Sequence, residues 1–263
     1  MDFLFTNSAD GTRLRLGRVG TGSRDLLIVH GLAEHAERYA HVADAAAKAG
    51  WRVTVLELRG HGHSGGRRGH VGQWSDYVAD VTAAAALLNA DYSMLAHSMG
   101  GLVTLDSLRS GLRPARVALS NPLLGVRVAA PQIKVKAAGL LSRIWPTLPL
   151  GNELNNAWLS RDKAVCDAYA ADPLVYSTIT PRWYTEMLKA LERVHSSRYN
   201  VPLALFYSDT DPITDPVAAK RLVEQNSGQT TGYPGMLHEI MNEIGKEQVI
   251  SDILAWLNTG SAS

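Results

Sequence analysis

Short apolar runs recur along the chain and are separated by stretches of helical periodicity. Apolar runs without polar alternation are typical of parallel strands whose two faces are both buried. Strands that alternate with helices indicate a doubly wound, mostly parallel sheet. The predicted strands are 26–30, 53–58, 92–97, 116–121, 202–208 and a short last strand near 230–233. The predicted helices are 36–49, 74–89, 99–110, 216–226 and 243–258.

Two parts of the chain depart from this alternation of strands and helices. FLFTNSADGTRLRLGRV, near the N-terminus, predicts two strands around an Asp10-Gly11 turn, because that dipeptide tolerates the positive φ of a tight hairpin. The interval from 122 to 195 has no run typical of a buried strand, and its length of about 70 residues is too great for a plain loop. We therefore predict an α/β core formed by 1–121 and 196–263, with a helical cap at 122–195 inserted after the sixth strand.

The composition narrows the class of protein. Hydrophobic residues make up 46% of the chain and charged residues 19%, which is typical of a globular domain. The net charge of +1 provides no field to attract a polyanion, so we expect no nucleic-acid partner. The single Cys166 cannot form an internal disulfide, and the first residues lack the basic and apolar regions of a secretory signal. We expect a cytoplasmic protein, whose oligomeric state the sequence does not define.

The segment YSMLAHSMGG places Ser98 between a predicted buried strand and a glycine pair that begins a helix. A nucleophile elbow has this setting, because its sharp turn exposes a serine oxygen at the edge of the sheet. The usual pattern is Gly-x-Ser-x-Gly, and Ala96 takes the first position here. A helix N-cap serine would fit the same local spacing, so the interpretation depends on partner residues.

Candidate partners follow in the expected chain order. A serine nucleophile needs a histidine base, and the histidine needs a carboxylate that fixes its tautomer. His238 follows the last predicted strand, and Asp209, Asp211 and Asp215 follow the strand before it. Asp209 lies almost on the strand end, and Asp215 precedes a proline as a helix N-cap does. Asp211 is therefore the preferred acid. We expect His97, beside Ser98, to have a packing or hydrogen-bonding role.

The segment RGHGHSGGRRGH, which follows the strand 53–58, invites other interpretations. A zinc site could use His61, His63 and His70, but the acidic or cysteine ligands and supporting residues of such a site are missing. A phosphate-binding loop needs a Lys-Ser/Thr pair at the start of a helix, which is also missing. We expect a structural loop beside the site, supported by hydrogen bonds of Arg59 and His61, with no metal and no cofactor.

Six segments together resemble the monoacylglycerol lipase and lysophospholipase group of α/β-hydrolases, a group that also carries the serine aminopeptidase S33 label. They are HGLAEHAERY, LRGHGHSGGRRGHVGQWSDYVADV, AHSMGG, LSRDKAVCDAYAADPLVY, YSDTDPITDP and YPGMLHE. The resemblance implies an α/β-hydrolase fold with Ser98 as nucleophile, His238 as base and Asp211 as the orienting acid. It also implies that the backbone N–H groups of Leu32 and Met99 bind the oxyanion, as an acyl-transfer site requires.

The resemblance further implies that the cap is a lid over an acyl chain. In animal members an arginine, a cap tyrosine and an acidic residue contact the glycerol head group. The first two correspond to Arg38 and Tyr169, while the third falls on the apolar Leu123. We also expect Leu123 and the cap residue Ile144 to contact the substrate.

The composition of the cap bears on the substrate. Residues 122–152 contain Arg127, Lys134, Lys136 and Arg143 together with many apolar residues and no acidic residue. A basic, apolar segment suits a lipid-like substrate and transient contact with a membrane or lipid interface. The same residues could instead pack on the sheet and leave a solvated basic face. A cap without carboxylates argues against an aminopeptidase, which must bind an ammonium group.

We therefore predict a serine carboxylester hydrolase that acts on monoacylglycerols or similar single-chain lipid esters through an acyl-enzyme on Ser98. Within enzymes, the alternatives are a lysophospholipase and a broad short-chain carboxylesterase. A ligand-binding or sensor protein that has kept the hydrolase fold is the non-enzymatic alternative, because function depends on the site rather than on the fold.

Overall fold

The computed structural model describes residues 1–127 and 132–259, and the side chains of 132–134, including that of Lys134, also lie outside the description. Its centre is an eight-stranded sheet in the order β1-β2-β4-β3-β5-β6-β9-β10. The strands from β4 to β10 pair in parallel and the first two are antiparallel, which confirms the predicted mostly parallel sheet. The strands are β1 (Asp2–Asn7), β2 (Arg13–Val19), β3 (Arg24–Val29), β4 (Trp51–Leu56), β5 (Ser93–His97), β6 (Arg116–Ser120), β9 (Leu203–Tyr207) and β10 (Gln229–Gly232).

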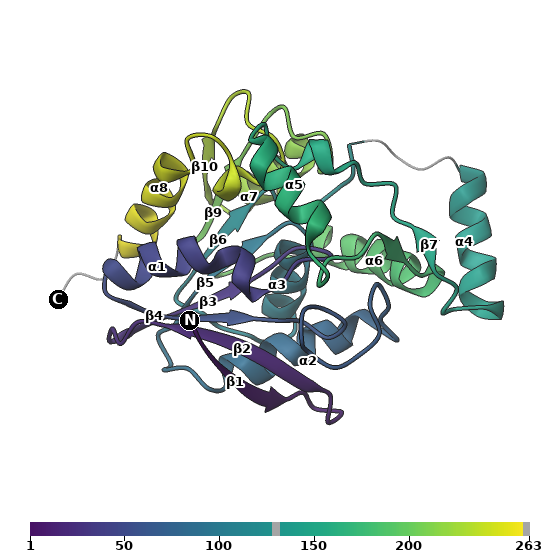
Figure 1. Cartoon of the computed structure of the whole chain (residues 1–263), viewed down its shortest axis with the longest axis horizontal. Helices are drawn as coiled ribbons and strands as arrows, with labels where there is room; N and C mark the ends of the chain where they lie inside the picture. The colour runs from purple at the N-terminus through teal and green to yellow at the C-terminus, as the bar shows by residue number, and fades with distance from the viewer. Residues whose placement is uncertain (128–131, 260–263) are drawn as a thin grey trace.

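Helices cover both faces of this sheet (Figure 1). On β3, Leu26 and Ile28 pack with α1 and α8, whereas Leu27 and Val29 pack with the hydrophobic cluster of α2, α3, α6 and α7. Successive residues of a strand point to opposite faces, so a strand covered on both sides reads as a continuous apolar run. The helices of the core are α1 (Ala40–Lys48), α2 (Trp74–Ala85), α3 (Met99–Arg109), α7 (Pro216–Gln225) and α8 (Lys246–Asn258), with 3₁₀ turns η1 (Ala36–Tyr39) and η3 (Ile240–Asn242).

The chain between β6 and β9 is mostly helical. Its last helix packs its buried residues, such as Trp183 and Met187, into the cluster formed by α2 and α3. Helix α4 packs against that helix and extends to one end of the molecule (Figure 1). The elements are α4 (Gln132–Ile144), β7 (Leu150–Gly151), η2 (Asn156–Trp158), α5 (Lys163–Ala171), β8 (Thr178–Ile179) and α6 (Pro181–His195). Strands β7 and β8 are two residues each, too short to leave a strand pattern in the sequence.

Some helix ends differ from the prediction for identifiable reasons. The predicted helix 74–89 ends at Ala85, because the N–H groups of Leu87 and Leu88 bond three positions back and form a turn. The predicted helix 243–258 begins only at Lys246, because Gly245 has a left-handed φ of 90°. Among the helices of the described residues, none is long and apolar enough to cross a membrane.

Candidate active site

Ser98 occupies the sharp turn between β5 and α3. Its φ of 49° and ψ of −120° are strained for a residue with a side chain and are typical of a nucleophile elbow. A Cβ on Gly100 would lie 2.4 Å from the carbonyl oxygen of Val29, so α3 can begin this close to β3 only because the residue is glycine. Ala96 is fully buried on β5, where its methyl group is part of the core.

His238 joins Ser98 to Asp211. The Nε2 atom of His238 lies 2.9 Å from the Ser98 Oγ, and its Nδ1 atom lies 2.8 Å from the Asp211 Oδ2. The Asp211 carboxylate also accepts hydrogen bonds from the N–H groups of Ile213 and Thr214 and from the Thr214 hydroxyl. These donors fix the carboxylate, which in turn orients the imidazole. The structure thus brings together the three residues predicted to act in catalysis.

The other two aspartates of the same turn have different contacts. Asp215 is the N-cap of α7, and its Oδ1 accepts the N–H groups of Val217 and Ala218. The backbone carbonyl of Asp209 accepts a hydrogen bond from Arg127. Only Asp211 of the three is hydrogen-bonded to His238 in the part of the chain that the structure describes.

The two histidines at the site have opposite electrostatic surroundings. Burial lowers the pKa of His238, but the carboxylates of Asp211, Glu239 and Glu34, with Asp211 first, together raise it by more, so the pKa lies above its ordinary value. Burial raises the pKa of Asp211, and the contact with His238 lowers it below the ordinary range. The pair therefore stabilises the imidazolium form. Burial lowers the pKa of His97 to about 4, and its Nδ1 lies 3.0 Å from the carbonyl oxygen of Ser120. His97 is thus a neutral, hydrogen-bonded neighbour.

The two predicted oxyanion donors lie on different turns, Leu32 on the turn after β3 and Met99 at the start of α3. Leu32 and Met99 both line the cavity that contains Ser98. The turn after β3 is held by Glu34, whose Oε2 accepts the N–H of Gly31 at 2.7 Å. Ala33 has a positive φ of 62°, so the chain bends sharply at a residue that is not glycine. Sequence reasoning missed Glu34, and its only signal was its place three positions after the glycine in HGLAEH.

Asn121 is a second residue that the sequence analysis missed. It follows β6 directly, and its Nδ2 donates to the carbonyl oxygen of His238 at 2.7 Å. Its Oδ1 accepts the N–H of Ser208 at 2.9 Å, at the end of β9. Asn121 therefore fixes the backbone of the histidine loop against two strand ends.

The cavity above Ser98 is mainly apolar. It lies between the carboxyl edge of the sheet and the segments that follow β6. Two of the predicted substrate contacts, Leu123 and Tyr169, are part of its wall. The lining residues are Gly31, Leu32, Glu34, His97, Ser98, Met99, Leu123, Val126, Asn152, Leu154, Leu159, Tyr169, Ile179, Trp183, Tyr184, Met187, Ile213, His238 and Glu239.

The other two predicted substrate contacts, Arg38 and Ile144, do not line this cavity. Arg38 donates to Glu34 at 3.2 Å and to both carboxylate oxygens of Glu239 at 2.8 and 2.6 Å, so its donors face carboxylates instead. Ile144 is 72% exposed at the end of α4, and α4 packs against α6, the helix whose other residues form part of the cavity wall. A contact of either residue with a substrate therefore stays a prediction.

The histidine-rich loop after β4 is a structural support. Arg59 forms ion pairs with Asp80 inside the protein and with Asp10 at the surface. The hydroxyl of Tyr176, in the segment after α5, lies 2.6 Å from the His61 Nε2. The loop thus links the core to the segment that follows α5, consistent with the hydrogen-bonding supports predicted for Arg59 and His61.

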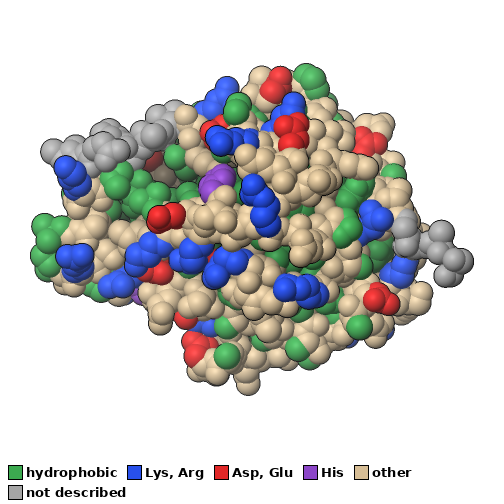
Figure 2. Space-filling view, turned by 180° about the vertical axis from the view of Figure 1, so that it is seen from behind, with side chains coloured by type: hydrophobic (Ala, Val, Ile, Leu, Met, Phe, Trp, Pro, Cys, Tyr) green, Lys and Arg blue, Asp and Glu red, His purple; other side chains and the backbone are tan. Residues whose placement is uncertain are grey.

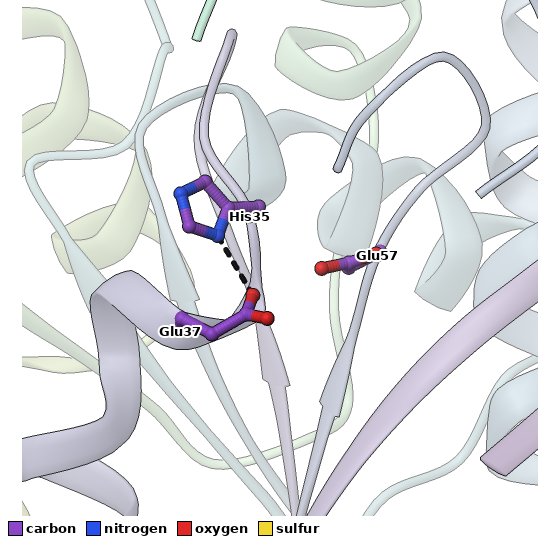
Figure 3. Close-up of side chains that lie close together, drawn as sticks. All are labelled: His35, Glu37 and Glu57. Atoms are coloured by element: carbon purple, nitrogen blue, oxygen red, sulfur yellow. Dashed lines mark hydrogen bonds and ion pairs between the residues drawn. The ribbon is translucent and has the colours of Figure 1, made fainter. Parts of the chain in front are cut away.

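One group of side chains has the spacing of metal ligands. His35, Glu37 and Glu57 point toward one another from η1, its flanking turn and the end of β4 (Figure 3), with ligand atoms within 4.8 Å. Arg15, however, donates to Glu37 at 2.8 Å and to Glu57 at 3.2 Å. Its guanidinium already binds both carboxylates and offsets part of the negative charge that would attract a cation. The group is better described as an ion-pair cluster.

Comparison with known proteins identifies the family of the chain. The family model described as serine aminopeptidase, S33, matches residues 23–245. The chain is 31% identical to the monoacylglycerol lipase of Mycolicibacterium smegmatis over 88% of this chain and 87% of that protein. It is 27% identical to phospholipase YtpA of Bacillus subtilis, covering 85% of this chain and 91% of that protein.

Solved structures give the same result. The crystal structure of the monoacylglycerol lipase of Paleococcus ferrophilus superposes with a TM-score of 0.86 at 28% identity and covers 98% of both chains. A monoglyceride lipase from Saccharomyces cerevisiae in complex with a substrate analogue has the same fold, with a TM-score of 0.84 at 18% identity, over 100% of this chain and 96% of that one. The chain therefore belongs to the serine aminopeptidase S33 family of α/β-hydrolases.

Proposed function

We propose that the protein is a serine carboxylester hydrolase that cleaves monoacylglycerols or similar single-chain lipid esters. The observation that carries the proposal is the hydrogen-bonded series from Ser98 through His238 to Asp211 at the wall of an apolar cavity. A histidine that is oriented by a buried carboxylate can accept the serine proton, which makes the hydroxyl an effective nucleophile.

The reaction proceeds in two halves. His238 removes the proton from the Ser98 hydroxyl while the oxygen attacks the ester carbonyl, and the N–H groups of Leu32 and Met99 stabilise the oxyanion. The imidazolium, stabilised by Asp211, then donates its proton to the leaving alcohol, and the acyl group remains on Ser98. Water attacks this acyl-enzyme with His238 again as base, which releases the fatty acid and restores the hydroxyl.

The cavity favours an acyl chain over a peptide amine. Its wall includes Leu123, Trp183, Met187 and other apolar side chains that can cover a hydrocarbon chain. The acidic residues in the wall, Glu34 and Glu239, are both bound by Arg38 and do not offer a free carboxylate to an ammonium group. We therefore propose an ester substrate, although the family also carries an aminopeptidase label.

We propose that residues 122–195 act as the cap and that α4 contacts the lipid interface. Leu140, Ile144 and Trp145 are 60%, 72% and 58% exposed, and the basic Lys136 and Arg143 lie among them. Figure 2 shows hydrophobic and basic side chains together at the end of the molecule where α4 lies. Exposed apolar area and attraction to anionic lipids add in interfacial binding.

The experiment that tests the function compares the wild type with Ser98→Ala on p-nitrophenyl esters and monoacylglycerols. We expect hydrolysis by the wild type and loss of hydrolysis in the variant, and retained turnover in the variant would contradict the mechanism. A panel with varied acyl length and head group separates a monoacylglycerol lipase from a lysophospholipase or a short-chain esterase. A Ser98 that does not react with a fluorophosphonate would favour the ligand-binding alternative.

A further inference from the structure

Three charged side chains at the cavity wall and directly behind it have no part in the proposed chemistry. Arg38, Glu34 and Glu239 have side chains that are only 9%, 4% and 3% exposed. The Nε atom of Arg38 donates to Glu34, and its Nη2 atom donates to both oxygens of Glu239. Two buried carboxylates therefore share one guanidinium. Charged groups are rarely buried without an interaction that offsets the unfavourable free energy of their desolvation.

Glu34 holds the oxyanion turn. Its Oε2 accepts the N–H of Gly31 and the hydroxyl of Tyr39, both at 2.7 Å. A Cβ on Gly31 would lie 2.7 Å from that oxygen and 3.1 Å from the Cβ of Ser98, so the turn is pressed between the carboxylate and the nucleophile. Any movement of Glu34 would move the neighbouring N–H of Leu32, the proposed oxyanion donor.

Glu239 holds the segment that carries the base. It follows His238 directly, and its N–H donates to the carbonyl oxygen of Leu159 at 2.8 Å. Its carboxylate binds Arg38 and accepts a further hydrogen bond from the Asn242 side chain at 2.9 Å. The position of the imidazole therefore depends on the same guanidinium that orients Glu34.

A third contact joins this group to the cap. The guanidinium carbon of Arg38 lies 4.6 Å from the centre of the Tyr169 ring, within the range of a cation–π interaction. Tyr169 belongs to α5 and lines the cavity above Ser98. Arg38 thus touches the oxyanion side, the base side and the cap at once.

We propose that Arg38 is a positioning residue that holds the oxyanion turn and the base segment in register through Glu34 and Glu239. This inference rests on the proposed function, and it assigns Arg38 a role different from direct contact with the substrate head group. Arg38 acts on the reaction through Glu34 and Glu239, so its loss changes the rate of the chemical step on any ester.

The charges of Arg38, Glu34 and Glu239 also affect the pKa of the base, His238. Burial raises the pKa of Glu239, and the nearby Glu34 carboxylate raises it further while Arg38 lowers it. Both carboxylates in turn raise the pKa of His238, in addition to the larger effect of Asp211. The charged or titratable groups that face His238 or Glu239 are Glu34, Arg38, Tyr39, His97, Tyr169 and Asp211.

The first test separates positioning from head-group binding. Monodecanoylglycerol and p-nitrophenyl decanoate share the acyl chain and differ in the alcohol. For Arg38→Met we expect kcat to fall roughly 100-fold on both esters, with KM changed less than about threefold. A rise in KM for the glycerol ester alone would overturn the proposal and restore Arg38 as a substrate ligand.

The second test measures how the negative charge of Glu239 affects the pKa of His238. Glu239→Gln keeps the shape of the side chain but removes a charge that raises the pKa of His238. We expect the acid limb of the kcat/KM profile to move to lower pH. An unmoved limb would overturn the proposal. Circular dichroism and thermal melting show whether Arg38→Met folds. If it does not, the kcat/KM profile of Glu239→Gln alone tests the proposal.

Arg15→Met is the matched control. Arg15 is equally buried, with a side chain that is 10% exposed, and it also binds two glutamates, away from Ser98. We expect it to lose stability without the selective loss of kcat or the shift of the acid limb, and an equal loss of kcat would overturn the proposal. Failure of the proposed function is distinguishable, because the wild type would then hydrolyse neither ester or Ser98→Ala would retain activity.

Discussion

Replacement of Asp211 by asparagine tests how the carboxylate controls His238. The Asp211 Oδ1 accepts the N–H groups of Ile213 and Thr214, so the carbonyl oxygen of an asparagine would take that place. The amide NH₂ would then occupy the position of Oδ2, which now lies 2.8 Å from the His238 Nδ1 and 2.6 Å from the Thr214 hydroxyl. A donor at this position forces Nδ1 to accept, so the ring proton moves to Nε2 and His238 can no longer accept the Ser98 proton.

The expected loss follows from this change of tautomer. Where an acid of this kind has been replaced by its amide in a serine protease, kcat falls by about 10⁴ while the geometry is retained. We expect a similar loss of kcat for Asp211→Asn, equivalent to about 5 kcal/mol of activation free energy. The assay is hydrolysis of p-nitrophenyl butyrate, with thermal melting as the measure of folding.

Two neighbouring aspartates provide controls of the same chemistry. Asp215→Asn changes the N-cap of α7, and asparagine caps helices well, so stability and activity should change little. Asp209→Asn should also retain activity, because Asp209 has no hydrogen bond to His238 in the described structure. Asp211→Asn with more than about a tenth of wild-type kcat would refute the tautomer argument, as would a comparable loss in either control.

Three further predictions follow from the site, the elbow and α4. Because Asp211 raises the pKa of His238, neutral base forms only at higher pH, and kcat/KM should rise through a pKa above about 6.5 when measured from pH 5 to 9. Gly100→Ala should destabilise the fold by about 1–3 kcal/mol, because its Cβ would clash with backbone, whereas Gly139→Ala, with open space on α4, should not destabilise it in urea unfolding. Trp145→Glu should weaken sedimentation with anionic vesicles and leave hydrolysis of a dissolved short ester unchanged, while Val217→Glu, 74% exposed on α7, should change neither.

Local patterns were sufficient to predict the sheet and the order of the candidate catalytic residues. The apolar runs indicated the buried strands because both faces of each are covered. The N-cap pattern at Asp215 removed one of three competing acids, and the structure indeed places that residue at the start of α7. These features depend on neighbours in the sequence, which a pattern can show.

Contacts between distant segments could not be predicted in this way. Arg38 and Glu239 are 201 positions apart, and no local pattern indicates that they form an ion pair. The interval 122–195 predicted a helical cap but not how its helices pack, so Ile144 was expected at the substrate, whereas α4 packs on α6 and leaves Ile144 exposed. Glu34 and Asn121 act through backbone groups of other turns, and such contacts exist only once the turns have formed.

Identification of the acylated residue tests the central claim most directly. The protein is incubated with a fluorophosphonate, digested, and the modified peptide is sequenced by mass spectrometry. The account predicts one adduct, on Ser98, that forms in step with the loss of esterase activity and is absent from Ser98→Ala. Inactivation with the adduct on another residue, or continued ester hydrolysis by a protein fully labelled on Ser98, would contradict it.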